Sequence, residues 1–164
     1  MIQRHYWCNT ILAGIITWMM IGCTDTTDCK YTANRSIKLN FMQYTPRRTL
    51  SDTVVSNLSV ATASGVLLYD SASAKQLQLP LSQLSDTSVF YFYFDSIAVD
   101  TLYVFAQRKI EMISPECGFN TRFTLDSARS SNNNIINILL VDRAVGDNAT
   151  TDRNLNMVIK KRPQ

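Results

Sequence analysis

The sequence has 164 residues, of which 46% are hydrophobic, and its 16 Lys+Arg against 13 Asp+Glu give a formal net charge of +3. The basic pairs Arg47-Arg48 and Lys160-Lys161 are too small to form a nucleic-acid-binding stripe, so no nucleic-acid partner is expected. The one histidine, His5, and both tryptophans lie within the first 22 residues. The rest of the chain therefore lacks the histidine that Ser-His-Asp or Cys-His catalysis and His-based zinc sites require.

Residues 1–22 have the layout of an export signal. Arg4 and His5 form a short basic start, and Ile11 to Gly22 is an apolar run that only Thr17 interrupts. A signal peptide needs ~7–15 apolar residues at its centre, whereas a helix that spans a membrane needs ~20. We therefore expect residues 1–22 to be a cleaved signal peptide, with a retained membrane anchor as the alternative.

The end of this run, Met20-Ile21-Gly22-Cys23, resembles the lipobox of bacterial lipoproteins, although Leu is commoner than Met at its first position. In that class the chain is cut before the cysteine, whose thiol carries a diacylglycerol thioether. The resemblance implies a lipid on Cys23 with further acyl chains, and two or more chains anchor a protein stably. It also implies an outer-membrane lipoprotein of a Gram-negative cell envelope, with the membrane as its first partner.

After the cleavage site, the polar residues 23–34 predict a short tether, and residues 35–164 predict a single domain. Cys8 lies in the leader and Cys23 takes the lipid, which leaves Cys29 and Cys117. An even pair of cysteines in an exported domain predicts a disulfide. Because the chain lacks a C-x-x-C motif, a structural bridge is favoured over a redox-active pair.

From residue 37 onward, alternating apolar and polar residues indicate β-strands. The clearest is Val89 to Phe94, whose three phenylalanines share one face and are predicted to enter the core, while Tyr91 and Tyr93 face the other way. Leu77 to Leu81 also alternates, and Pro80 marks it as an edge strand or an extended segment, because proline cannot donate a ladder hydrogen bond. Other strands are predicted at residues 37–41, 54–61, 66–69, 102–106, 110–113, 119–125, 135–141 and 155–159. The pattern leaves room for one short helix, near residues 80–84 or 125–131.

These elements predict an all-β fold. Strands of even spacing, rich in β-branched and aromatic residues and separated by Ser, Thr, Asn and Asp, are typical of a sandwich or barrel rather than a parallel sheet. We expect an antiparallel β-sandwich of the immunoglobulin-like kind with about 8–10 short strands.

Four stretches of the chain resemble an uncharacterised family of small envelope lipoproteins from Bacteroidota-type bacteria. They are Leu79-Pro80-Leu81, the strand VFYFYF at 89–94, residues 100–104, and the segment Ile113-Ser-Pro-Glu-Cys-Gly-Phe119, which is the most specific. The family has no established activity, so the resemblance implies the address and a β-rich fold and assigns no catalytic residue.

A repeated Asp, then Ser or Thr, then a small or apolar residue looks like the O-glycosylation signal of exported proteins in that bacterial group. The alternative is that Asp-Ser and Asp-Thr are ordinary turn and cap residues. The candidate acceptors are Thr26, Thr53, Ser71, Ser96, Thr101 and Ser127.

The leading functional hypothesis is a non-enzymatic, lipid-anchored envelope protein with a binding or structural role toward an envelope partner, because exported sandwiches commonly bind through loops and edge strands. Tyr91 and Tyr93 either form a contact patch or lie beneath the second sheet, and a long aromatic strand favours the latter.

Two alternatives remain open. A hydrolase acting on glycan or peptide would need carboxylates in one cleft, drawn from Asp95, Asp100, Glu111 and Glu116. A calcium-binding module would use the oxygen ligands of the loop at 142–152, namely Asp142, Asp147, Asn148 and Asp152, although their spacing does not match an EF-hand. Scattered acids and a turn-rich loop explain both sets more simply, so no catalytic residue, metal site or cofactor is assigned.

Overall fold

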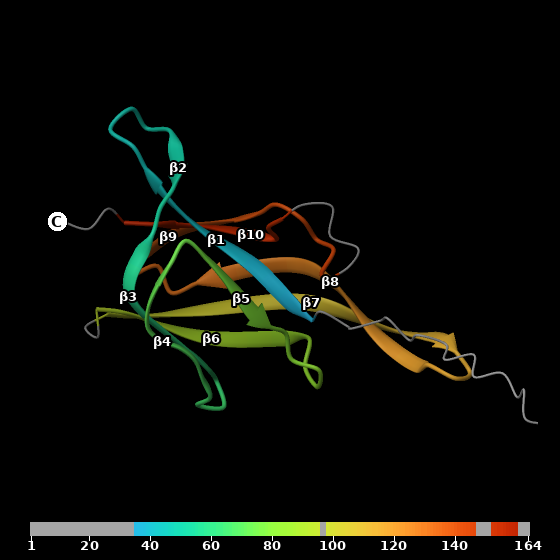
Figure 1. Ribbon diagram of the computed structural model, residues 1–164. Coiled ribbons are helices and arrows are strands. Elements are labelled where there is room, and N and C mark those ends of the chain that lie inside the picture. The colour runs from blue at the N-terminus through green and yellow to red at the C-terminus, as the bar shows by residue number, and fades with distance from the viewer. Residues whose placement is uncertain (1–34, 96–97, 147–151, 161–164) are drawn as a thin grey trace, which may run out of the picture. The chain divides into compact units, whose positions relative to one another are not determined.

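The computed structural model describes residues 35–95, 98–146 and 152–160, which belong to the unit Tyr31–Gln164 (Figure 1). The expected signal peptide and tether lie outside the described residues. Within the described residues the chain forms ten strands and no helix. The strands are β1 (Ser36–Tyr44), β2 (Leu50–Asp52), β3 (Val55–Thr62), β4 (Leu67–Ala74), β5 (Gln76–Pro80), β6 (Thr87–Phe94), β7 (Ala98–Ser114), β8 (Gly118–Ser130), β9 (Ile135–Leu140) and β10 (Leu155–Ile159).

The first sheet is built on β1. One edge of β1 pairs with β10, its other edge pairs with β5 and β2, and β9 follows β10. The β1–β10 pair is parallel, with Leu39 opposite Leu155 and Met42 opposite Val158. No hairpin fixes the relative direction of these two strands, because they come from opposite ends of the domain.

The second sheet has the order β4-β3-β6-β7-β8 and is antiparallel throughout. The β7–β8 hairpin is its longest part, and Figure 1 shows the end of that hairpin projecting beyond the rest of the two sheets. The two sheets pack face to face, so the predicted all-β sandwich is confirmed, while its immunoglobulin-like character stays a prediction.

The core lies between the sheets. Phe90, Phe92 and Phe94 are all buried, as their shared face of β6 predicts. The Phe92 ring packs edge-on against Phe41 of the other sheet at 6.5 Å and stacks on Phe94 at 6.1 Å between centroids. Such aromatic pairs add to the free energy that burial of the side chains already contributes.

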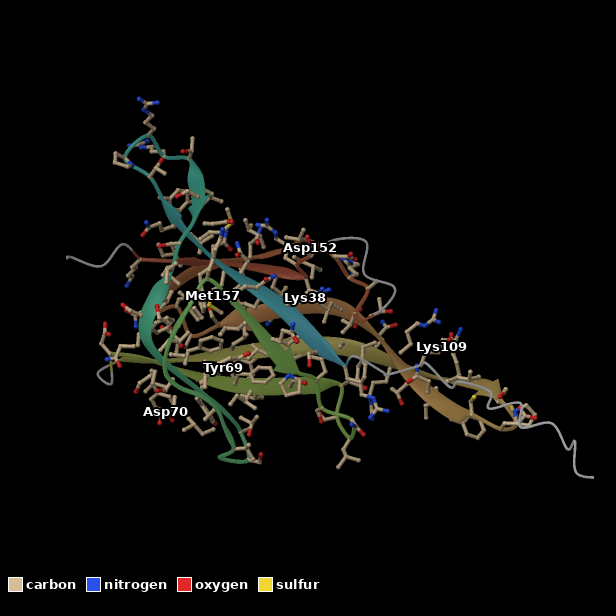
Figure 2. The ribbon with its side chains drawn as sticks, in the orientation of Figure 1. Lys38, Tyr69, Asp70, Lys109, Asp152 and Met157 are labelled. Carbon is tan, nitrogen blue, oxygen red and sulfur yellow. The ribbon has the colours of Figure 1, made fainter. Side chains whose placement is uncertain are left out.

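A tyrosine also joins the two sheets. The hydroxyl of Tyr69 on β4 accepts a hydrogen bond from the Gln78 backbone N–H at 3.0 Å and donates one to the Gln78 carbonyl at 3.1 Å, on β5. Figure 2 shows Tyr69 and Met157 within the body of the sandwich. This pair of bonds fixes the edge strand β5 against the second sheet.

The structure corrects several element predictions. Residues 102–106 and 110–113 belong to one strand, β7, because the polar residues 107–109 that interrupt the apolar pattern lie where β7 leaves the core. The short strand β2 carries no clear alternation and was missed. The short helix is wrong at both places, since residues 125–130 continue β8 and residues 80–84 end a strand and turn. The edge position of β5 is confirmed, because β1 is its strand partner.

The outward face of β6 also differs from expectation. Tyr93 is 36% exposed and Tyr91 is half-buried, and only the phenylalanine side of β6 meets the other sheet. The prediction that both tyrosines lie beneath the second sheet is therefore wrong.

Candidate functional site

Asp100 is the most buried of the candidate catalytic acids, with no exposed surface. Its Oδ1 accepts hydrogen bonds from the Ser131 hydroxyl at 2.9 Å and the Asn133 backbone N–H at 2.8 Å. Its Oδ2 accepts one from the Asn134 backbone N–H at 2.7 Å. The carboxylate therefore fastens β7 to the turn that carries the chain from β8 into β9, which is a structural task.

The four candidate acids are divided between two regions of the second sheet, with Asp95 and Asp100 near the β6–β7 turn and Glu111 and Glu116 near the β7–β8 turn. Asp95 is exposed in the turn after β6, while Glu111 and Glu116 belong to the projecting end of the β7–β8 hairpin. Asp100 and Glu111 are eleven residues apart on one strand, which is ~36 Å at the usual rise, against the ~5–10 Å of a glycosidase pair. The structure does not bring this predicted set together.

Two of the four calcium candidates, Asp142 and Asp152, lie among the described residues, and each accepts a hydrogen bond. The Asp142 carboxylate accepts a hydrogen bond from the Ala144 N–H at 2.9 Å, and the Asp152 carbonyl accepts one from the Gln76 side chain at 2.7 Å. Asp147 and Asn148 lie outside the described residues. Among the residues that are described, no three His, Cys, Asp or Glu side chains are grouped as metal ligands.

One ion cluster holds segments that are distant in sequence. The Asp52 carboxylate accepts a hydrogen bond from the Asn40 amide at 2.9 Å, lies 2.9 Å from the Lys75 Nζ, and lies 3.4 Å from Arg153. The hydrogen bond from Lys75, then that from Asn40, lowers the pKa of Asp52 below its ordinary value. This arrangement keeps Asp52 ionised and binds β2 to β1 and to the loop before β10.

The six candidate glycan acceptors divide by exposure. Ser71 and Ser127 are exposed, whereas Thr53 and Thr101 are half-buried, and Thr26 and Ser96 lie outside the described residues. Ser71 has a φ of 46°, and its hydroxyl donates to the carboxylate of Asp70 at 3.2 Å. Thr101 follows Asp100, which is fully buried. A glycosyltransferase that recognises the aspartate of the signal could not reach it in the folded domain.

Cys117 lies in the turn between β7 and β8. Its backbone N–H donates to the Ser114 hydroxyl at 3.1 Å, and its sulfur is disulfide-bonded. Cys29 lies outside the described residues, so its predicted pairing with Cys117 stays a prediction. Gly118 closes the turn with a φ of 71°, the left-handed conformation that a three-residue hairpin loop with a bulge requires.

The projecting end of the hairpin has one apolar side, which we call the tip face: Ile110, Met112 and Phe119. Their side chains are 70%, 58% and 72% exposed, and Met112 is directly opposite Phe119 in the ladder. The tip face continues the core side of β8, where Phe123 and Leu125 are buried. The tip face is exposed because the hairpin extends beyond the edge of the first sheet, which covers Phe123 and Leu125.

The reverse side of the same hairpin end is polar and ion-paired. Glu111 lies 3.0 Å from the Lys109 Nζ and 3.0 Å from an Arg122 side-chain nitrogen. The hydrogen bond from Lys109 and the charge of Arg122 lower the pKa of Glu111. Figure 2 shows Lys109 on this projecting part. Since Lys109 and Arg122 are opposite each other in the ladder, Glu111 removes the repulsion that two adjacent cations would cause.

Two other surfaces are weaker candidates. The outer face of the second sheet carries Tyr93, Val99 and Tyr103, which are exposed by only 36–41%, and an antiparallel sheet commonly leaves such a face to solvent. A hollow of about 370 Å³ lies beside the β3–β4 turn, and its hydroxyl residues include Thr62, Ser64 and Ser88. Its lining holds no titratable side chain, so it offers no acid or base for catalysis.

Sequence reasoning missed the tip face. The sequence predicts strands at 110–113 and 119–125, and the pattern of these strands gives no sign that the opposite sheet ends before Ile110, Met112 and Phe119. The available signal was the polar run at 107–109, which separates these residues from the core of β7.

In the part of the chain that the structure describes, no helix is long and apolar enough to cross a membrane. A search of curated proteins and a search of solved structures each gave no match. One family model matches residues 51–158, which is well over half of the sequence. That stretch includes both strands of the projecting hairpin and the core face of β6. The chain therefore belongs to a family of unknown function, DUF6452.

Proposed function

We propose that this protein is a non-enzymatic lipoprotein of a Gram-negative cell envelope, of the Bacteroidota type, which is held by lipid on Cys23 and binds through the β7–β8 hairpin. The observation that carries the binding role is the tip face, where three large apolar side chains stand in solvent on a hairpin whose reverse side is ion-paired. Apolar groups gathered on a protruding element, with polar residues around them, are typical of an interaction site.

The anchor is supported by the leader and by the residues at its end. The basic start, the apolar run of residues 11–22 and the sequence Met-Ile-Gly-Cys at 20–23 together fit the substrate of lipoprotein processing. With Cys23 lipidated, the disulfide of Cys117 pairs with Cys29 in this proposal. That bond would tie the tether to the turn of the same hairpin that carries the tip face.

Glycans are a further part of the proposal, at Ser71 and Ser127. Both serines are exposed and follow exposed aspartates, Asp70 and Asp126, so an envelope enzyme can reach acceptor and aspartate together. Thr101 stays bare because Asp100 is buried. Mass spectra of peptides from the native protein test this: hexose-containing forms at Ser71 or Ser127 support it, and bare peptides at both overturn it.

The anchor is tested by palmitate labelling and detergent-phase partitioning in a Bacteroidota host. The wild-type chain should incorporate label and enter the detergent phase, and Cys23→Ser should lose both. Cys29→Ser is the matched control, because it removes a neighbouring thiol and keeps the lipid site, so it should still label. Equal labelling of wild type and Cys23→Ser would contradict the proposed anchor.

A further inference from the structure

We infer that the tip face of the β7–β8 hairpin rests in the surface of the lipid bilayer that holds the anchor, so that the domain is attached at two points. This inference rests on the proposed lipid anchor and names the partner of the proposed binding element.

The described chain begins near the place where the hairpin leaves the sandwich. The Arg35 carbonyl accepts a hydrogen bond from the Leu81 N–H at 2.8 Å. A few residues further along the same loop, Asp86 and the Gln83 carbonyl bind the Arg108 guanidinium at 2.6 and 2.7 Å. Arg108 lies where β7 leaves the core. The described chain, and with it β1, therefore begins at the end of the sandwich from which the hairpin projects (Figure 1).

The length of the tether limits how far the domain can lie from the lipid. Twelve peptide units separate Cys23 from Arg35, so the tether spans at most ~40 Å when fully extended. From Arg108 to Pro115 the hairpin advances about 23 Å at the usual strand rise. The hairpin is thus long enough to cover much of the distance between domain and lipid. If Cys117 pairs with Cys29, the turn is only six peptide units, or ~20 Å, from the lipidated residue.

The side chains of the tip face suit the surface of a lipid bilayer. Ile110, Met112 and Phe119 are side chains that partition into the boundary between headgroups and acyl chains, where an amphipathic element lies flat at a depth of roughly 5–10 Å. The backbone groups that β7 and β8 turn toward each other are hydrogen-bonded in the hairpin, so they can lie near lipid. The opposite side of the hairpin, with the ion-paired Glu111, faces water. A weak contact suffices, because the anchor holds the tip at high local concentration.

The charges of this region make a specific prediction about lipid type. Lys109 and Arg122 are balanced by Glu111 and Glu116 around the turn. The contact should therefore form on zwitterionic phosphatidylcholine and change little with salt, unlike that of a basic patch on anionic lipid.

A single tryptophan reports the contact directly. The full chain with Trp7→Phe and Trp18→Phe is given Phe119→Trp on the tip face, and the matched control is Tyr44→Trp, which lies at the opposite end of β1 and is also exposed. The purified lipoproteins are reconstituted in phosphatidylcholine vesicles with brominated acyl chains. We expect a blue shift at position 119 and quenching at least about three-fold stronger than at position 44. Adding Ile110→Ser and Met112→Ser to the Phe119→Trp chain should abolish that difference.

The intact mass of the same samples separates the two proposals. A lipidated chain whose tryptophan at 119 is quenched no more than that at 44 overturns the inference and leaves the anchor standing. A concentration-dependent blue shift at 119 without lipid quenching means a second copy or another protein covers the tip, and this also overturns it. A chain without lipid refutes the anchor, and quenching at 119 by added vesicles then still decides whether the tip face binds lipid.

Discussion

Replacement of Asp100 separates a structural role from a catalytic one. In the wild type its carboxylate is fully buried and accepts three hydrogen bonds, from the Ser131 hydroxyl and from the backbone N–H groups of Asn133 and Asn134. Asp100→Ala removes all three bonds and leaves two backbone donors in the β8–β9 turn without their acceptor.

The magnitude follows from those bonds. A hydrogen bond to a charged group contributes ~1.5–3 kcal/mol, and the three are not additive because Ser131 and Asn133 are exposed and water replaces part of the loss. We expect Asp100→Ala to lower the free energy of unfolding by about 3 kcal/mol, which corresponds to a fall in Tm of about 10 °C for a domain of this size. Asp100→Asn keeps one acceptor oxygen but turns an amide toward a donor, so it should lose about 2 kcal/mol.

Urea unfolding followed by circular dichroism measures these differences at pH 7. The matched control is Asp126→Asn on the exposed side of β8, which should change stability by less than about 0.5 kcal/mol. A loss below about 1 kcal/mol in Asp100→Ala would refute the structural assignment. A hydrolase that used Asp100 predicts the reverse, with activity abolished and stability unchanged.

Three further predictions concern the sandwich itself. Asn154→Ala should lower the free energy of unfolding by about 2–3 kcal/mol in urea titrations. The buried Asn154 amide accepts a hydrogen bond from the Lys38 N–H and donates one to the Ala144 carbonyl, and both are lost. A loss under about 0.5 kcal/mol would count against this role. Phe92→Ala should lower the free energy of unfolding by about 3–5 kcal/mol and Tyr93→Ala by under about 1 kcal/mol, because Phe92 faces the core and Tyr93 faces solvent. Equal Tm shifts for the two variants in calorimetry would contradict this. Because the pKa of Asp52 is lowered in the fold, its stabilisation is present at neutral pH and is lost as the pH falls through that lowered value. Asp52→Asn should therefore flatten the acid limb of a Tm-against-pH curve, and an unchanged limb would show that the cluster contributes nothing.

The sequence predicted the parts of the fold that depend on local alternation. Phe90, Phe92 and Phe94 repeat at every second position, so their burial follows from the strand period alone. Pro80 gave the edge position of β5 for an equally local reason. The long strand β7 was divided in two because residues 107–109 are polar, and polarity there reflects the end of the opposite sheet, which no local pattern records.

The site was harder to predict because its determinants are distant in sequence. The hydrogen-bond donors to Asp100 follow it by 31 to 34 residues. In the sequence, an Asp before a Thr looks the same whether it caps a turn, belongs to a glycosylation signal or is a buried structural carboxylate. Ile110, Met112 and Phe119 have the pattern of core residues, and only the tertiary structure shows that nothing in the described part of the chain covers them.

The intact mass of the protein taken from its native membrane, recorded with and without reductant, tests the central claim most directly. We expect a chain that begins at Cys23, carries the mass of its acyl chains, and gains the mass of two hydrogens on reduction as the Cys29–Cys117 bond opens. Hexose-sized increments on that mass would agree with glycans at Ser71 or Ser127. A chain that still begins at Met1, or one without acyl mass, would contradict the lipid anchor and remove the basis for placing the hairpin at a membrane.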